Sequence, residues 1–393
     1  GAGKTTVVRQ MIGTNPKTER FPSISAAKTT ICDIEVVFAE GPFRAAVSFI
    51  PRAQVRQYIT ECAVAAIAAH LESGPPSEAV RRFMEHSEQR FRLGYILGQL
   101  RPTTAASDED LLDDEEDAET ELEDTEVTGE DRATFADRLR QFLDRIESLA
   151  VRSRDKIADA AQEFEIDLAR ASAKDRDILQ ELAEEQLLQD DDFHRLVDEI
   201  LDEVEARFDY VTSGTLERNR DEWPRLWTYE TGDRDSFIKA VNRFTSNYAP
   251  NFGRLLTPLV EGVRVAGPFA PAWDSDELPR MVLLDGQGIG HTADSTSSIS
   301  TGITKRFQLA DVILLVDSAA QPMQAGPVAV LQTLVASGHE SKLAVVFTHF
   351  DEVTGDNLVR NTDKQDHVTS SFYNAIQAIG KTSGRDAETS LKR

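Results

Sequence analysis

The chain has 393 residues, 40% hydrophobic and 28% charged, so it is long enough for two or three domains with buried cores. Its formal net charge is −25, and residues 102–131 hold fifteen Asp and Glu without any Lys or Arg. This balance excludes an extended basic surface, so we expect no nucleic-acid partner. With two cysteines and no apolar run of about 20 residues, we expect a cytoplasmic protein without a transmembrane segment. Cys32 and Cys62 are expected to be small buried hydrophobes.

A segment with the sequence Gly-Ala-Gly-Lys-Thr-Thr opens the chain at residues 1–6, before an expected helix over residues 7–12. Gly3-Lys4-Thr5 matches the second half of the phosphate-loop motif G-x-x-x-x-G-K-[ST], although a chance match at a helix start is the alternative. In such a loop, backbone N–H groups contact phosphate oxygens, the Lys reaches the β- and γ-phosphates, and the hydroxyl binds Mg²⁺. The candidate nucleotide-binding residues here are Gly1, Ala2, Gly3, Lys4, Thr5 and Thr6. Because no initiator Met is present, we expect the leading glycine of the motif to precede Gly1.

A polar stretch rich in Ser and Thr follows at residues 22–30 and ends on Thr29 and Thr30. Two runs typical of β-strands come next, at residues 34–38 and 45–50, with Glu-Gly-Pro between them. Such a pattern predicts a β-hairpin with a loop longer than the tightest type.

Residues 51–275 change to a helical period and form an expected insertion. The acidic run at residues 107–131 has the composition of a solvated linker. A long charged helical stretch is expected over residues 133–208. The segment that follows has four large aromatic residues that could form a compact core: Trp223, Trp227, Phe237 and Phe244.

After residue 271 the sequence returns to an α/β pattern. Apolar runs at residues 281–284, 312–316 and 343–347 are separated by helical stretches, which predicts buried parallel strands with crossover helices. The predicted domains are therefore an α/β nucleotide-binding domain from residues 1–50 and 276–393, and the inserted segment 51–275.

Polar residues follow two of these expected strands. The run at 281–284 ends on Asp285-Gly286-Gln287-Gly288, where Asp285 could hold Mg²⁺ and the N–H of Gly288 could approach a γ-phosphate. The run at 343–347 ends on Thr348-His349-Phe350-Asp351. Ligands bind at the carboxyl ends of strands in open parallel sheets, although either segment could be an ordinary polar strand end.

Four of these segments follow one another along the chain: Gly3-Lys4-Thr5, Thr29-Thr30, Asp285–Gly288 and Thr348–Asp351. They are counterparts of a phosphate loop, a switch Thr, strand-D-x-x-G and strand-[NT]-K-x-D. In that order the α/β pieces resemble the TRAFAC-class P-loop GTPases, which include Ras-like and dynamin-related proteins. The resemblance implies a P-loop sheet with flanking helices, interrupted here by a mostly helical insertion. It further implies that Thr29 or Thr30 joins Thr5 and Asp285 in binding Mg²⁺, and that Thr348, His349 and Asp351 contact guanine. It also implies a last strand beyond Arg393.

Two positions depart from the family pattern. His349 stands where the family has Lys, although its ring could stack on the base and Asp351 could still accept guanine N1–H and N2–H₂. Ile289 stands where Ras-like members carry the Gln that orients the attacking water. Gln287 and His291 are the neighbours that could take that catalytic role beside Lys4.

We therefore hypothesise that the chain is an enzyme that binds GTP with Mg²⁺ and hydrolyses it. The helical insertion would be the output that changes with nucleotide state, or that binds a protein partner or a second copy. One alternative is a P-loop ATPase, favoured if His349 has abolished guanine reading. The other is a nucleotide-binding scaffold with little hydrolysis, which would fit Ile289.

Overall fold

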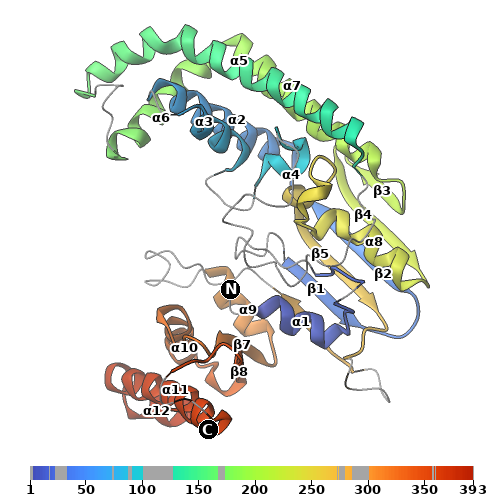
Figure 1. Cartoon of the computed structure of the whole chain (residues 1–393), viewed down its shortest axis with the longest axis vertical. Coiled ribbons are helices and arrows are strands. Elements are labelled where there is room, and N and C mark those ends of the chain that lie inside the picture. The colour runs from blue at the N-terminus through green and yellow to red at the C-terminus, as the bar shows by residue number, and fades with distance from the viewer. Residues whose placement is uncertain are drawn as a thin grey trace. The chain divides into compact units, whose positions relative to one another are not determined.

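The computed structural model describes most of the chain (Figure 1). The described residues are 3–16, 18–22, 33–72, 75–86, 91–100, 127–166, 173–271, 273, 279–285, 301–355, 358 and 360–392. They divide into two compact units, a first of Gly1–Val8 with Gly288–Arg393 and a second of Arg9–Gln287. Helices and strands occur in both units, so the expected mixed α/β class is confirmed. No helix within these ranges is long and apolar enough to cross a membrane.

The second unit contains a six-stranded sheet with the order β3-β4-β2-β5-β1-β6. Its strands are β1 (Asp33–Phe38), β2 (Phe43–Phe49), β3 (Thr215–Arg218), β4 (Pro224–Thr231), β5 (Val260–Gly267) and β6 (Val282–Asp285). Alternate residues of β2 are buried, as the two-residue period of a strand requires. Three strands, β3 to β5, come from the segment expected as a helical insertion. The domain boundaries predicted at residues 50 and 275 therefore pass through this sheet.

The predicted hairpin between β1 and β2 is wrong. Strand β5 lies between them, parallel to β1 and antiparallel to β2. The four residues 39–42 that join β1 to β2 can cross over one strand, because strands lie about 4.8 Å apart and each extended residue spans about 3.3 Å. The length of the loop alone therefore does not show whether β1 and β2 pair with each other or have another strand between them.

Helices and 3-10 turns make up most of the described residues between 51 and 259. They are α2 (Arg52–Leu71), α3 (Pro76–Met84), α4 (Leu93–Leu97), α5 (Gly129–Gln162), α6 (Ala173–Leu187), α7 (Asp191–Ala206) and α8 (Arg234–Thr245), with 3-10 turns η3 (Arg207–Tyr210), η4 (Ala249–Asn251) and η5 (Thr257–Leu259). The single long stretch expected from residue 133 is three helices. α5 begins at a capping box between Thr128 and Asp131, and α7 begins at Asp190, whose carboxylate accepts the N–H of Asp192 at 2.8 Å.

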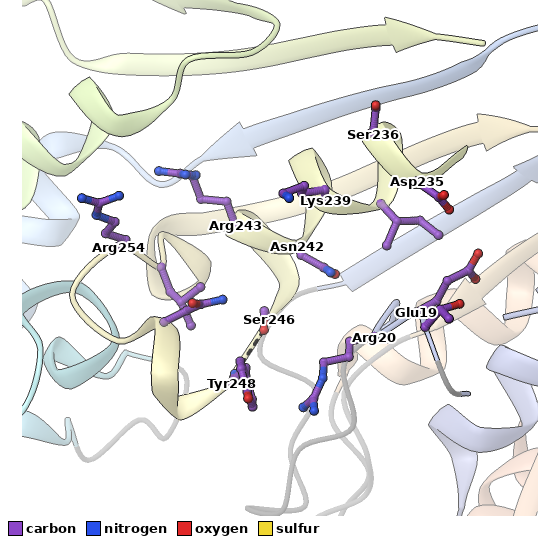
Figure 2. A pocket seen from close by; sticks show the side chains of 14 residues that line it. Glu19, Arg20, Asp235, Ser236, Lys239, Asn242, Arg243, Ser246, Tyr248 and Arg254 are labelled. Atoms are coloured by element: carbon purple, nitrogen blue, oxygen red, sulfur yellow. Dashed lines mark hydrogen bonds between the residues drawn. The ribbon is translucent and has the colours of Figure 1, made fainter. Parts of the chain in front are cut away.

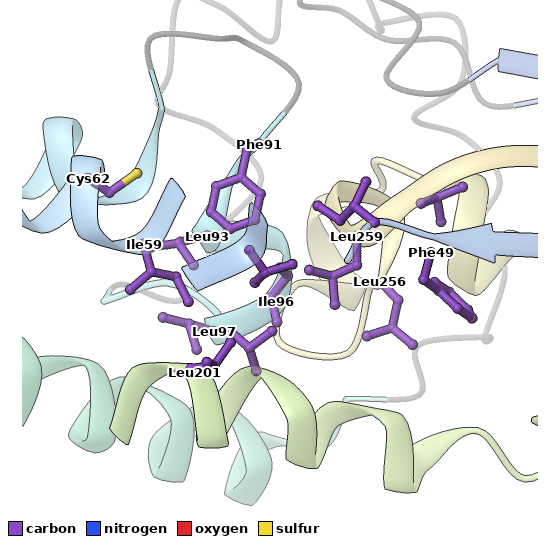
Figure 3. Packing of buried hydrophobic residues seen from close by; sticks show 14 of the residues in the cluster. Phe49, Ile59, Cys62, Phe91, Leu93, Ile96, Leu97, Leu201, Leu256 and Leu259 are labelled. Atoms are coloured by element: carbon purple, nitrogen blue, oxygen red, sulfur yellow. The ribbon is translucent and has the colours of Figure 1, made fainter. Parts of the chain in front are cut away.

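The core of the second unit joins its helices to its sheet. Leu256 and Leu259 lie between Ile96 of α4 and Phe49 of β2 (Figure 3). The four aromatic residues predicted to form a core are all buried, which confirms that expectation: Trp223, Trp227, Phe237 and Phe244. Cys62 is also buried, as expected, and burial raises the pKa of its thiol.

The first unit contains a two-stranded parallel sheet of β7 (Ile313–Ser318) and β8 (Leu343–Thr348). Its helices are α9 (Thr301–Leu309), α10 (Ala325–Ser337), α11 (Asn361–Ser383) and α12 (Arg385–Leu391), with the turn η7 (Glu340–Lys342). α10 connects β7 to β8, so the predicted parallel pair with a crossover helix is confirmed here. The run at 281–284 differs, because β6 pairs antiparallel with β1 in the other unit. Helix α1 (Lys4–Ile12) begins in the first unit, and the division falls between its residues Val8 and Arg9.

Candidate functional site

Two segments from opposite ends of the chain meet in the first unit. Gly3 immediately precedes α1 and has a φ of +69°, a left-handed conformation that favours glycine. A Cβ placed on Gly3 would lie 3.0 Å from Oγ1 of Thr348, at the carboxyl end of β8. The backbone of Gly3 thus passes so close to this strand end that a side chain there would fit only if Thr348 moved by a few tenths of an ångström. Half of the predicted phosphate loop and the predicted base-reading motif are therefore neighbours.

The start of α1 presents Lys4 and Thr5 half-buried and Thr6 exposed. The carbonyl of Gly3 accepts the N–H of Val7 at 3.0 Å, so Gly3 sits where the helix begins. The first turn of α1 contains no acidic residue. A helix start of this kind carries a partial positive charge and N–H groups that favour an anion.

The strand ends of β7 and β8 are tied together beside Gly3. The hydroxyl of Thr348 donates to the carbonyl of Asp317 at 3.2 Å, and the N–H of Ala319 donates to the carbonyl of Thr348 at 2.8 Å. Because Thr348 contacts both β7 and Gly3, it fixes the position of the residues that follow it.

His349 and Asp351 form the turn after β8. His349 adopts a left-handed φ of +53°, which is uncommon for a residue other than glycine, and its Nδ1 lies 3.0 Å from Oε1 of Glu352. Phe350 packs into a small cluster with Val353 and Val368, while Asp351 is exposed. The turn is thus anchored through Phe350 and presents a carboxylate to solvent.

Asp317 is a buried acid at this site that the sequence interpretation missed. Its side chain is 4% exposed, and its Oδ2 accepts the N–H of Met323 at 2.7 Å. Burial raises the pKa of this carboxyl, against the opposing effect of N–H donors from Met323 and Ser318. The signal was present, since Asp317 follows an apolar strand just as Asp285 does.

The remaining predicted residues are either in the second unit or outside the described ranges. Asp285 belongs to the second unit, where it is 3% exposed at the end of β6, opposite Ile34 of β1. Seven predicted residues lie outside the described ranges: Gly1, Ala2, Thr29, Thr30, Gln287, Gly288 and His291. Among the residues that are described, no three His, Cys, Asp or Glu side chains gather into a metal-binding cluster.

Comparisons of this chain with family models, with curated proteins and with solved structures found no match. The fold defines a mixed α/β protein. Its function must therefore be inferred from the arrangement of Gly3–Thr6 beside the end of β8.

Proposed function

We propose that the chain binds GTP with Mg²⁺ and hydrolyses it, as a P-loop GTPase. The observation that carries this proposal is the contact between Gly3 and Thr348. A phosphate-binding helix start and a base-reading turn must lie within one nucleotide's length of each other. The sequence separates them by almost the whole chain, so their adjacency is not a consequence of local sequence.

The phosphates are assigned to the start of α1. Backbone N–H groups around Gly3 and the dipole of α1 favour the negative charge, and Lys4 supplies a compensating cation. Thr5 offers a hydroxyl oxygen, a hard ligand of the kind that Mg²⁺ prefers. We assign Thr29 or Thr30 as the switch residue, and Gln287 or His291 as the group that orients water.

The base is assigned to the turn after β8. An exposed carboxylate at Asp351 can accept both N1–H and N2–H₂ of guanine, whereas adenine offers no such pair. The ring of His349 supplies a flat surface in place of the Lys stem. Adenine specificity is the competing proposal, and the panel of nucleotides below separates the two.

The helices α2 to α7 are assigned as the output. They follow directly on β2, within the segment that separates the predicted switch threonines from Asp285. In this proposal they respond to the nucleotide state, and they offer the surface for a protein partner or a second copy.

The test measures the affinity of the full chain for GTP, GDP and ATP with Mg²⁺, comparing Lys4→Ala with the native protein. We expect Lys4→Ala to lose at least about tenfold in GTP affinity, because the phosphates lose their cation. Lys381→Ala, an exposed lysine on α11, is the matched control and should bind normally. Near-normal GTP binding by Lys4→Ala would remove the phosphate-loop assignment, and tighter binding of ATP than of GTP would favour the ATPase.

A further inference from the structure

A cavity of about 510 Å³ lies in the second unit, apart from the residues assigned to the nucleotide (Figure 2). Its walls are α8, the segment 246–255 that follows it, and residues 18–20. Sites for small molecules usually have volumes of about 300–1,000 Å³, so the cavity is large enough to hold one.

The cavity concentrates positive charge in a chain that is acidic overall. Four cationic side chains line it, Arg20, Lys239, Arg243 and Arg254, against the two carboxylates of Glu19 and Asp235. They come from three separate segments, and Figure 2 labels each of them among the side chains that line the cavity.

One of the two carboxylates, Glu19, and one of the four cations, Arg254, already have a partner of opposite charge. Glu19 is buried and receives Nε of Arg234 at 2.7 Å and Nη2 of the same arginine at 3.0 Å. Arg234 is not among the residues that line the cavity, so it neutralises Glu19 without taking up space in the cavity. The pair also holds residues 18–20 against the start of α8, and this places Arg20 at the cavity.

Buried polar atoms at the cavity lack hydrogen-bond partners. They are Nε of Arg254 and the side-chain oxygens of Asn242 and Asn251. Arg254 is held on its other side, where Nη2 donates to Asp131 at 2.9 Å and the guanidinium lies 4.4 Å from the ring of Tyr210. Unmade hydrogen bonds of buried groups cost free energy, so a small shift of these three side chains that brought the atoms to a ligand in the cavity would be favoured.

The walls are built before any ligand arrives. The hydroxyl of Thr257 donates to the carbonyl of Ser246 at 2.6 Å, and the N–H of Tyr248 donates to Oγ of Ser246 at 3.1 Å. Arg20 lies 4.0 Å over the ring of Tyr248. Side chains fixed in this way lose little conformational entropy when they bind a ligand.

We propose that this cavity is a second binding site, for a small organic phosphate that carries two or more negative charges. Guanidinium groups bind phosphate oxygens through paired N–H donors, and Lys239 adds a point charge. The two asparagine amides can accept hydroxyl groups on the body of the ligand or, turned over, donate to further phosphate oxygens. The multiple cations favour a polyanion over a single carboxylate.

The test is titration calorimetry of pyrophosphate into the full chain carrying Lys4→Ala, so that binding at the proposed nucleotide site is weakened. We expect saturable binding to one site. Adding Lys239→Ala or Arg243→Ala should weaken it by at least about tenfold, since each removes a charged phosphate contact. Arg225→Ala is the matched control, because Arg225 is an exposed arginine of the same unit outside the cavity and pairs with Glu217.

Three results would overturn the proposal: no pyrophosphate binding to the Lys4→Ala protein, equal weakening by Arg225→Ala, or unchanged affinity in both cavity variants with unchanged melting temperatures. Since Lys4 is absent throughout, failure here leaves the GTPase proposal untouched. A second experiment distinguishes a lipid headgroup from a soluble phosphate as the ligand of the cavity. Pyrophosphate-sensitive sedimentation with phosphatidic acid vesicles would assign a lipid headgroup, and pyrophosphate binding without sedimentation would assign a soluble ligand.

Discussion

Asp351 offers the sharpest test of nucleotide identity at the scale of single residues. If its carboxylate accepts the N1–H and N2–H₂ of guanine, Asp351→Asn places an amide donor against a donor. Mispairing of this kind costs about 1–3 kcal/mol, so we expect GTP affinity to fall by roughly ten- to a hundredfold. Xanthosine triphosphate has a carbonyl in place of the guanine amino group and should bind the variant more tightly than it binds the native protein.

The comparison needs a control for general damage to the turn. Asp366→Asn, at an exposed aspartate on α11, should change neither affinity. Competition binding with GTP, ATP and xanthosine triphosphate measures all three proteins. Equal weakening of GTP and ATP by Asp351→Asn, with no gain for the xanthine nucleotide, would show that residues 348–351 do not read a base.

Asp317 predicts a pH dependence of stability. Burial raises its pKa above the ordinary value of 3.8, so the folded protein favours the neutral carboxyl more than the unfolded chain does. This acid therefore weakens the fold as pH rises above about 4. Asp317→Asn keeps an acceptor for the N–H of Met323 and should raise the melting temperature at pH 7, with the gain shrinking toward pH 3.

The matched control for that experiment is Asp311→Asn, at an exposed aspartate just before β7. It should show no comparable gain. A loss of stability in Asp317→Asn at pH 7, or the same gain at pH 3 and at pH 7, would contradict the role assigned to burial.

Some residues of the candidate site could be identified from the sequence alone, and others could not. Lys4, Thr5 and Thr348 were identifiable because each lies at the end of a strand or the start of a helix, which local pattern reveals. Asp317 was visible in the same way and was overlooked. The closeness of Gly3 to Thr348 could not be predicted from pattern, because it depends on how distant segments pack.

At the level of single elements, helix α7 allows the stabilisation from exposed ion pairs to be compared with the stabilisation from apolar burial. Glu199 of α7 receives Arg145 of α5 at 2.5 Å and lies 3.9 Å from Arg138, but these side chains are 36–42% exposed. Exposed pairs contribute about 0.2–1 kcal/mol each, whereas truncating a fully buried Ile costs about 2–5 kcal/mol. We therefore expect Glu199→Gln to lower the free energy of unfolding slightly and Ile200→Ala, at a position 0% exposed, to lower it severalfold more.

Urea unfolding followed by circular dichroism measures both variants. The small effect of Glu199→Gln should vanish at about 1 M salt, where charges are screened within about 3 Å. The effect of Ile200→Ala should persist there. A larger loss from Glu199→Gln than from Ile200→Ala would show that the charged contacts of α7 outweigh its apolar face.

The elements themselves were easier to predict than their partners. The runs at 34–38 and 45–50 do form strands, because β-branched and aromatic residues at alternate positions suit a half-buried sheet. Their expected mutual pairing failed because the edge of each is filled by β5, which lies more than two hundred residues further along the chain. The local sequence around β1 and β2 contains no information about a distant strand that pairs with them instead.

At the scale of the whole molecule, the two units have separate cores. Leu331 belongs to the core of the first unit and Leu259 to that of the second, and both are 0% exposed. Since, among the described residues, neither core contains residues of the other unit, we expect two transitions in differential scanning calorimetry. Leu331→Ala and Leu259→Ala should each lower one transition, a different one in each case, because a buried Leu→Ala costs about 2–5 kcal/mol.

The double variant serves as the control, since independent units should give additive shifts. A single transition that both substitutions lower together would show that the two cores unfold as one cooperative body.

The strand order also has a consequence for synthesis on the ribosome. β2 pairs with β4 and β5, while β1 pairs with β5 and β6, so neither N-terminal strand finds these neighbours before residue 224 has been made. At about 5–20 residues per second, the interval after β2 is complete is roughly 10 to 35 seconds. Throughout that time the nascent chain carries the apolar face of β2, with Phe43, Val47 and Phe49, and no strand to hydrogen-bond its edges. During translation β2 therefore stays exposed and unpaired until its partner strands are made. A chaperone that binds nascent apolar strands would be expected to bind it in that interval.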